Sequence, residues 1–117
     1  MAENIITKPL LALRGMMVFP GMVSNLDIGR EKSINALDAA MAEDKLIILV
    51  TQKDPEITDV TVDDMYPFGV LAQVRQQTKL PNGALRVLVE GLERVQLTMV
   101  TNSTQPNNYF IGQGIVV

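Results

Sequence analysis

Five carboxylates lie close together in the middle of the chain, and clustered carboxylates could bind a divalent cation. They are Asp54, Glu56, Asp59, Asp63 and Asp64. Their spacing does not follow a Ca²⁺-binding loop, and no glutamate stands where such a loop needs a bidentate ligand. The surrounding residues 52–66 are rich in Asp and Thr and include a proline. This composition is typical of a solvated surface loop, so we expect no metal site.

A serine acts as a nucleophile only beside an activating base. The sequence contains three serines and several lysines, so its composition permits a Ser–Lys pair. None of Ser24, Ser33 and Ser103 lies in a nucleophile motif. The sequence has no histidine and no cysteine, which excludes a Ser-His-Asp triad, a thiol nucleophile and a His or Cys zinc site. No G-x-x-x-x-G-K-[ST] motif occurs, and nothing indicates the paired carboxylates of a glycosidase. We therefore predict a binding or positioning role, without catalysis and without a cofactor.

Residues 16–22 form an unusually apolar turn, Met-Met-Val-Phe-Pro-Gly-Met, in which Pro-Gly is the turn signal. The preferred interpretation is that these side chains close one end of a hydrophobic core, because apolar residues are usually buried. The alternative is that some remain exposed as an adhesive patch, since methionine adapts to many partners.

Length, composition and net charge limit the classes of protein to which the chain can belong. Its 117 residues suit one domain, and 47% of them are hydrophobic, so disorder is not favoured. The net charge of −3 opposes a nucleic-acid role, which needs a concentrated basic face. The N-terminus does not resemble a signal peptide, and the longest uncharged apolar run, residues 46–50, is too short to span a membrane. With no cysteine as well, we expect a cytoplasmic protein that binds neither membrane nor nucleic acid.

A long β-hairpin is predicted around Pro81-Asn82-Gly83, because these residues favour a tight reversal of the chain. Residues 68–78 before the turn alternate between apolar and polar, with Phe68, Val70, Ala72 and Val74 on one face. Residues 85–89 after it are apolar on both faces, which is typical of a central strand.

The remaining elements make the fold mainly β with one α-helix, as one domain over residues 1–117. A helix is predicted over residues 30–43 from the spacing of Ile34, Leu37 and Met41. Residues 1–8 are expected to be a loosely held terminus. The chain stops inside its last strand, which suggests a piece of a longer protein. Further strands are predicted at residues 9–14, 23–28, 46–51, 94–100 and 109–117.

Several stretches together resemble one family, the N-terminal (LON substrate-binding) domain of bacterial ATP-dependent Lon protease. Residues 9–22 resemble its opening P-L-L-x-L-R…V-x-P-x-M, and residues 29–33 with 39–41 resemble its helix. Residues 48–54, 68–70 and 80–94 complete the series in the order of the family, over about residues 9–97. Each stretch is weak alone, and the combination is specific.

The resemblance implies a PUA-like pseudo-barrel of about six strands with one helix. It also implies a longer protein: a hexameric, ATP-dependent serine endopeptidase with a Ser–Lys dyad, using ATP and Mg²⁺, whose helical, AAA+ and protease modules would lie beyond Val117. None of their motifs is in this chain, so no catalytic or cofactor-binding residue can be carried over. The domain would recognise unfolded or degron-bearing proteins for degradation in protein quality control.

The residues predicted to capture such substrates are the apolar side chains of the two turns. An apolar patch suits unfolded substrates, because exposed hydrophobic residues are the feature that unfolded chains share. Three alternatives stay open: a structural spacer that orders the hexamer without touching substrate, an RNA-binding barrel, and a small-ligand receptor. The net negative charge counts against RNA binding, and the lack of tryptophan counts against a small-ligand receptor, which would need an aromatic cage. The candidate residues are Met16, Met17, Phe19, Pro20 and Met22 and, as second choice, Leu80 and Pro81.

Overall fold

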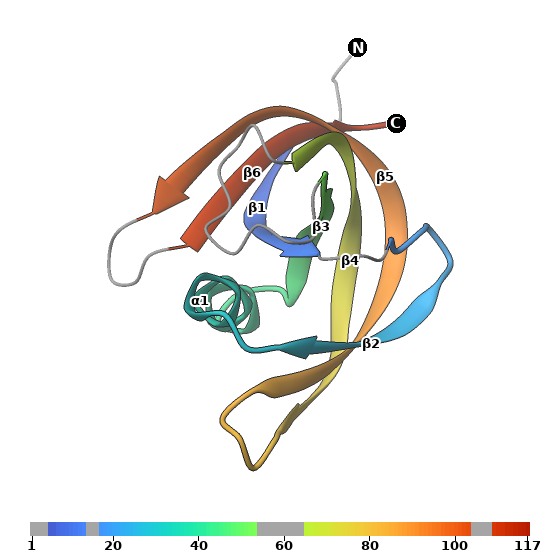
Figure 1. Ribbon diagram of the computed structural model, residues 1–117. Helices are drawn as coiled ribbons and strands as arrows, with labels where there is room; N and C mark the ends of the chain where they lie inside the picture. Colours follow the sequence, from blue (N-terminus) through green and yellow to red (C-terminus); the bar gives the residue numbers. More distant parts are fainter. Residues whose placement is uncertain (1–4, 14–16, 54–64, 104–108) are drawn as a thin grey trace.

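A computed structural model describes residues 5–13, 17–53, 65–103 and 109–117. The described part contains six strands and one helix (Figure 1). In chain order they are β1 (Ile5–Leu13), β2 (Val23–Ile28), α1 (Glu31–Met41), β3 (Leu46–Gln52), β4 (Met65–Lys79), β5 (Leu85–Ser103) and β6 (Tyr109–Val116). The predicted class, mainly β with one helix, is confirmed.

The six strands close into a twisted pseudo-barrel, as predicted. Their order is β2-β5-β4-β3-β1-β6, and a further pairing between β5 and β6 joins the sheet into a ring. Only β1 and β3 pair in parallel; the other neighbours are antiparallel. β5 pairs with β2, β4 and β6, so it is a central strand, as predicted. The prediction that residues 85–89 are apolar on both faces was wrong, because Leu85, Val87 and Val89 are buried on one face whereas Arg86 on the other is exposed.

Two predicted strand boundaries were wrong. Residues 5–8 are not a loose terminus, because they pair with residues 112–115 of β6. Residues 85–89 and 94–100 are not separate strands either, because β5 runs unbroken past Gly91. The register between β4 and β5 shifts at this point: Ala72 is opposite Gly91 and Leu71 is opposite Glu93, so Leu92 is an extra residue in a β-bulge.

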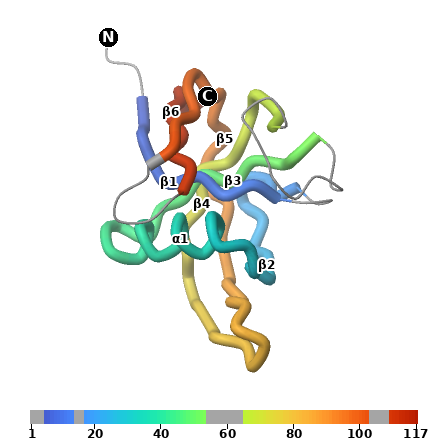
Figure 2. Tube along the Cα trace, turned by 60° about the vertical axis from the view of Figure 1, so that its left-hand side comes forward, coloured from blue at the N-terminus to red at the C-terminus, as the bar shows by residue number. Residues whose placement is uncertain are grey.

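The predicted hairpin joins β4 to β5 and projects from the barrel (Figure 2). The Leu80 N–H donates to the Ala84 carbonyl at 2.9 Å, and the Ala84 N–H donates to Asn82 Oδ1 at 3.0 Å. Gly83 has a φ of 88°, in the left-handed region that favours glycine.

Gly83→Ala is expected to lower the free energy of unfolding by about 1 kcal/mol, because a Cβ is disfavoured at this positive φ. No heavy atom lies within 4 Å of the added Cβ, so the effect is one of backbone conformation alone. Urea denaturation followed by circular dichroism measures it. An unchanged midpoint would contradict the strain assigned to this turn.

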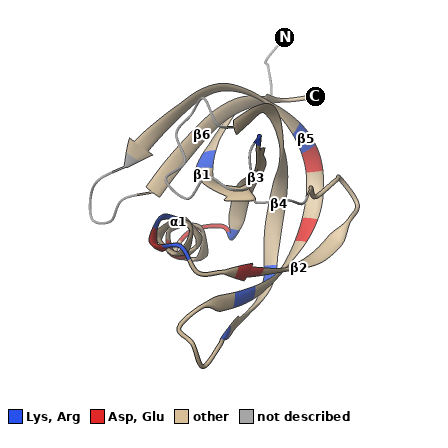
Figure 3. Ribbon diagram, in the orientation of Figure 1, with Lys and Arg blue, Asp and Glu red and all other residues tan. Residues whose placement is uncertain are grey.

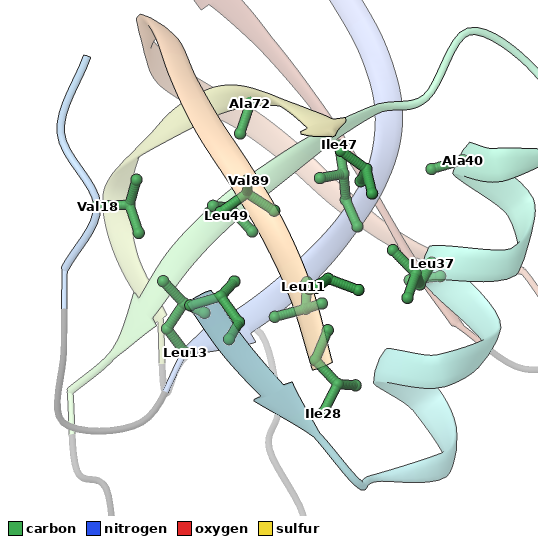
Figure 4. Packing of buried hydrophobic residues seen from close by; sticks show 14 of the residues in the cluster. Leu11, Leu13, Val18, Ile28, Leu37, Ala40, Ile47, Leu49, Ala72 and Val89 are labelled. Carbon is green, nitrogen blue, oxygen red and sulfur yellow. The ribbon is translucent and has the colours of Figure 1, made fainter. Parts of the chain in front are cut away.

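The main core fills the barrel between the sheet and α1 (Figure 4). Leu37 and its helix neighbours Ala36 and Ala40 are at most 1% exposed and belong to one cluster with residues of β1 to β5. The strands that α1 contacts most are β1, β6 and β3. Of the predicted helical stripe, Ile34 and Met41 only border this cluster. The helix thus holds β1 and the β2–α1 connection in fixed positions.

Candidate functional site

A small hollow of about 270 Å³ lies where residues 17–20 pass over the barrel. Met17, Phe19 and Pro20 form one wall, and Phe68 and Arg94 contribute from β4 and β5. The hollow thus gathers three of the predicted substrate-binding residues. Val18, Leu49, Thr51, Gly69 and Val70 complete the lining.

The loop before β2 takes its shape from a tight turn over residues 19–22. The Met22 N–H donates to the Phe19 carbonyl at 3.0 Å, and Gly21 has a φ of 84°. Proline followed by a residue of positive φ is the signature of a type II turn, so Pro20-Gly21 dictates this geometry. Two backbone hydrogen bonds of 2.8 Å, from Gly21 to Gly91 and from Gly91 to Met22, fasten the turn to β5.

Gly91 is the position on which the loop rests. A Cβ at this residue would lie 2.3 Å from the Phe19 carbonyl oxygen and 3.3 Å from a methyl group of Val70. No side chain larger than hydrogen fits this approach of two backbones. The glycine therefore sets where Phe19 stands on the surface.

The loop exposes large apolar side chains. Phe19 is 58% exposed, Met17 49% and Met22 38%, and Phe68 across the hollow is 42% exposed. We call Met17, Phe19, Pro20, Met22 and Phe68 the apolar surface. Exposed apolar side chains gathered in this way are typical of sites that bind proteins.

Charged residues border the apolar surface but do not enter its loop. Figure 3 shows no charged residue in the segment that precedes β2, and residues 17–22 contain none. The Arg94 guanidinium carbon lies 5.0 Å from the centre of the Phe68 ring, within the range of a cation–π contact. Arg94 therefore covers part of the Phe68 ring and adds one positive charge to the rim.

The preferred prediction for the apolar turn, burial in the core, was wrong for Met17, Phe19 and Met22 and right for Val18, which is 5% exposed. Val18 fills the barrel end, while its neighbours turn outward. Met16 lies outside the described residues. The two predicted turns do not form one surface. Leu80 is half-buried and Pro81 exposed at the tip of the hairpin, away from the loop before β2 (Figures 1 and 2).

Phe68 and Arg94 were missed as members of this site. The alternation in β4 grouped Phe68 with the buried Val70, but the strand pairing changes here. On β3, Val50 is opposite Gly69 and Gln52 is opposite Met65, so residues 66–68 face a single residue of β3. This bulge leaves Phe68 at the surface, and an irregular pairing cannot be read from local alternation.

Residues 5–13, 17–53, 65–103 and 109–117 bear on two further features, a metal-binding group and a membrane-spanning helix. No group of three or more His, Cys, Asp or Glu in these ranges could hold a metal ion. The acidic cluster of the sequence, residues 54–64, lies outside them. No described helix is long and apolar enough to cross a membrane.

Comparison with known sequences identifies relatives that are Lon proteases. The chain is 50% identical over 97 residues to Lon protease of Desulforamulus reducens, 53% over 95 residues to that of Halothermothrix orenii and 48% over 89 residues to Lon protease 1 of Bacillus subtilis. These alignments cover 83%, 81% and 76% of this chain. The chain spans only about 12% of the length of each of these relatives.

Solved structures share the fold. The N-terminal domain of Mycobacterium avium complex Lon protease matches with a TM-score of 0.73 and 22% identity, over 96% of this chain and 55% of that one. A Lon N-terminal domain protein from Xanthomonas campestris matches with a TM-score of 0.70 and 11% identity, over 95% and 59%. The family model of the ATP-dependent protease La (LON) substrate-binding domain matches residues 7–115. The chain therefore belongs to the family of Lon substrate-binding domains.

Proposed function

We propose that this domain captures unfolded or degron-bearing proteins through the apolar surface and delivers them to an ATP-dependent Lon serine protease for degradation. The observation that carries this proposal is the exposure of Phe19 and Met17 around an uncharged loop whose shape is fixed by hydrogen bonds to Gly91. Because that conformation is held by the barrel, exposure of these side chains is a property of the fold.

The chemistry of the apolar surface suits substrates that share no sequence. A hollow of about 270 Å³ admits a few apolar side chains and encloses no larger ligand. The unbranched side chains of Met17 and Met22 can adjust to different partners, which favours degenerate recognition. Weak binding suffices if several copies of the domain act together, as in the hexamer that we propose for the full-length protein.

The rest of the protein would supply the catalytic parts. We propose that ATP and Mg²⁺ bind, and that peptide bonds are cleaved, in modules that this chain does not contain. The cytoplasm is the proposed site of action, and the absence of cysteine from the sequence fits a reducing compartment. The partners of this domain are then unfolded proteins and the remainder of its own chain.

The proposal predicts that the chain binds an unfolded protein and ignores its folded form. A fluorescently labelled protein that has been reduced and carboxymethylated, so that it stays unfolded, should increase in anisotropy as the chain is added. The same protein with its disulfides intact is the control and should not. Equal anisotropy changes for both forms would contradict selective capture, and no change for either form would contradict capture and favour the spacer.

A further inference from the structure

Methionine carries all the side-chain sulfur of this chain, because the sequence has seven methionines and no cysteine. Among the methionines that the structure describes, Met17, Met22 and Met99 are each at least 38% exposed. Met65 is only 5% exposed, and Met41 is partly buried against the main core. Exposure governs how readily an oxidant reaches a sulfur atom. Met17, Met22 and Met99 are therefore the described methionines most open to oxidation.

Two of these three methionines belong to the apolar surface. Met17 lines the hollow of about 270 Å³ together with Phe19 and Phe68. Met22 ends the turn that presents Phe19, since its N–H donates to the Phe19 carbonyl at 3.0 Å. Met99 lies on β5, outside both the loop and the hollow. Oxidation would thus alter the apolar surface on either side of Phe19, and the modified Met99 would serve as a reference elsewhere on the barrel.

A peroxide oxidises a thioether by transferring one oxygen atom to it. The sulfur lone pair attacks one oxygen of hydrogen peroxide, and the S–O bond forms as the O–O bond breaks. The proton of the transferred oxygen moves to the departing oxygen, which leaves as water. The sulfur loses two electrons and the peroxide gains them, so no further reagent is needed. The product is methionine sulfoxide, a polar side chain that methionine sulfoxide reductases convert back.

A sulfoxide is a poor partner for an apolar segment of a client. Its oxygen is a hydrogen-bond acceptor, and covering an acceptor without a donor is unfavourable. None of the side chains of the apolar surface carries an N–H or O–H group, and Arg94 at the rim lies over the Phe68 ring. A client would therefore bury the sulfoxide oxygen without a donor from this surface. Oxidation also removes the apolar, adaptable side chain on which degenerate recognition depends.

Oxidation of Met17 and Met22 should leave the fold in place. The turn is fastened to β5 by two backbone hydrogen bonds of 2.8 Å, from Gly21 to Gly91 and from Gly91 to Met22, and neither involves a thioether. The buried side chain of the loop is Val18, which contains no sulfur. The modification would therefore change the affinity for a client rather than the free energy of unfolding.

We propose that Met17 and Met22 are sites of reversible oxidation by peroxide, and that their oxidation switches off capture at the apolar surface. In the reduced state both thioethers contact the client. In the sulfoxide state the client binds weakly, and enzymatic reduction restores capture. This inference rests on the proposed function, because it assigns a mode of regulation to the same surface.

Treatment of chain 1–117 with hydrogen peroxide, ended by catalase before the client is added, tests the switch. Mass spectrometry of proteolytic peptides should find sulfoxide at Met17, Met22 and Met99 before Met65. The reduced and carboxymethylated client should then bind about tenfold more weakly, as expected for a buried acceptor without a donor. Circular dichroism verifies that the oxidised chain stays folded.

The outcomes of this titration separate the switch from the proposed function. Full affinity of a chain oxidised at Met17 and Met22 would overturn the switch and leave the proposed function standing. Oxidation of Met65 as fast as that of Met17 would also overturn the switch. Failure of the untreated chain to bind the client would contradict the proposed function, and the switch with it.

Leucine variants assign the effect to the two sites, because leucine keeps an apolar side chain of similar volume and has no sulfur. For each variant, the affinity before peroxide is the reference for the affinity after it. Peroxide should leave the affinity of the double variant Met17→Leu, Met22→Leu unchanged, and should weaken that of Met99→Leu as it weakens wild type. Reductases for both sulfoxide epimers should restore wild-type affinity. A double variant that keeps its sensitivity to peroxide, or a wild-type affinity that reduction does not restore, would overturn the proposal.

Discussion

Phe19→Ser is expected to weaken binding of an unfolded client by roughly tenfold without unfolding the domain. Phe19 is 58% exposed, so its removal leaves no cavity in the core. When a client binds, the exposed part of the Phe19 ring would be removed from water. A serine at this position would lose about 1.5 kcal/mol of the binding free energy that this burial contributes. Anisotropy with a reduced and carboxymethylated client measures the change.

Met99→Ser is the matched control for this prediction. Met99 is 55% exposed on β5, outside the loop and the hollow. A comparable apolar area is removed there, so the control separates a local effect from a general loss of surface hydrophobicity. Client binding should stay within twofold of wild type, roughly the experimental error. If both variants weaken binding equally, no particular surface is responsible.

Gly91→Ala is expected to destabilise the fold by about 3 kcal/mol, because the new methyl group would overlap a backbone atom that has no room to move. The Cβ would stand 2.3 Å from the Phe19 carbonyl oxygen. Relief requires the loop to leave β5, which breaks its two hydrogen bonds to Gly91. Both the free energy of unfolding and client binding should therefore fall.

Gly29→Ala serves as the control for this second prediction. A Cβ at Gly29 would meet only the Ala84 Cβ, at 4.0 Å, and Gly29 does not have a positive φ. This variant should unfold within about 0.5 kcal/mol of wild type, as surface substitutions usually do. Urea titrations of the two variants compare them directly. Equal stability of Gly91→Ala and Gly29→Ala would show that the loop does not rest on Gly91.

The sequence predicted those features that depend on short-range chemistry. Pro81-Asn82-Gly83 form the hairpin turn, and residues 85–89, of which all but Arg86 are apolar, form a strand that pairs with β2 and β4. The helix was found from the spacing of its apolar residues. In each case neighbouring residues carry the information, because turn dihedrals and strand periodicity are local properties.

The exposure of the apolar surface depends on long-range packing instead. Met17, Val18 and Phe19 are all apolar, yet only Val18 is buried, since the turn at Pro20-Gly21 is held against Gly91, far along the chain. Phe68 joins them through a bulge opposite β3. Pairing of β6 with β1 likewise ends at Leu10, although β1 continues to Leu13. Where two strands stop pairing, or pair irregularly, is set by the closure of the whole barrel, so the local sequence does not predict it.

The most direct test of substrate capture is an NMR titration of the chain with its methionine methyl groups labelled. Methionines lie inside the apolar surface, at Met17 and Met22, and outside it, at Met99. An unfolded client should shift the signals of Met17 and Met22 and leave that of Met99 in place, and a folded control protein should shift none. Signals of Met17 and Met22 that stay unchanged at saturating client would contradict capture by this surface.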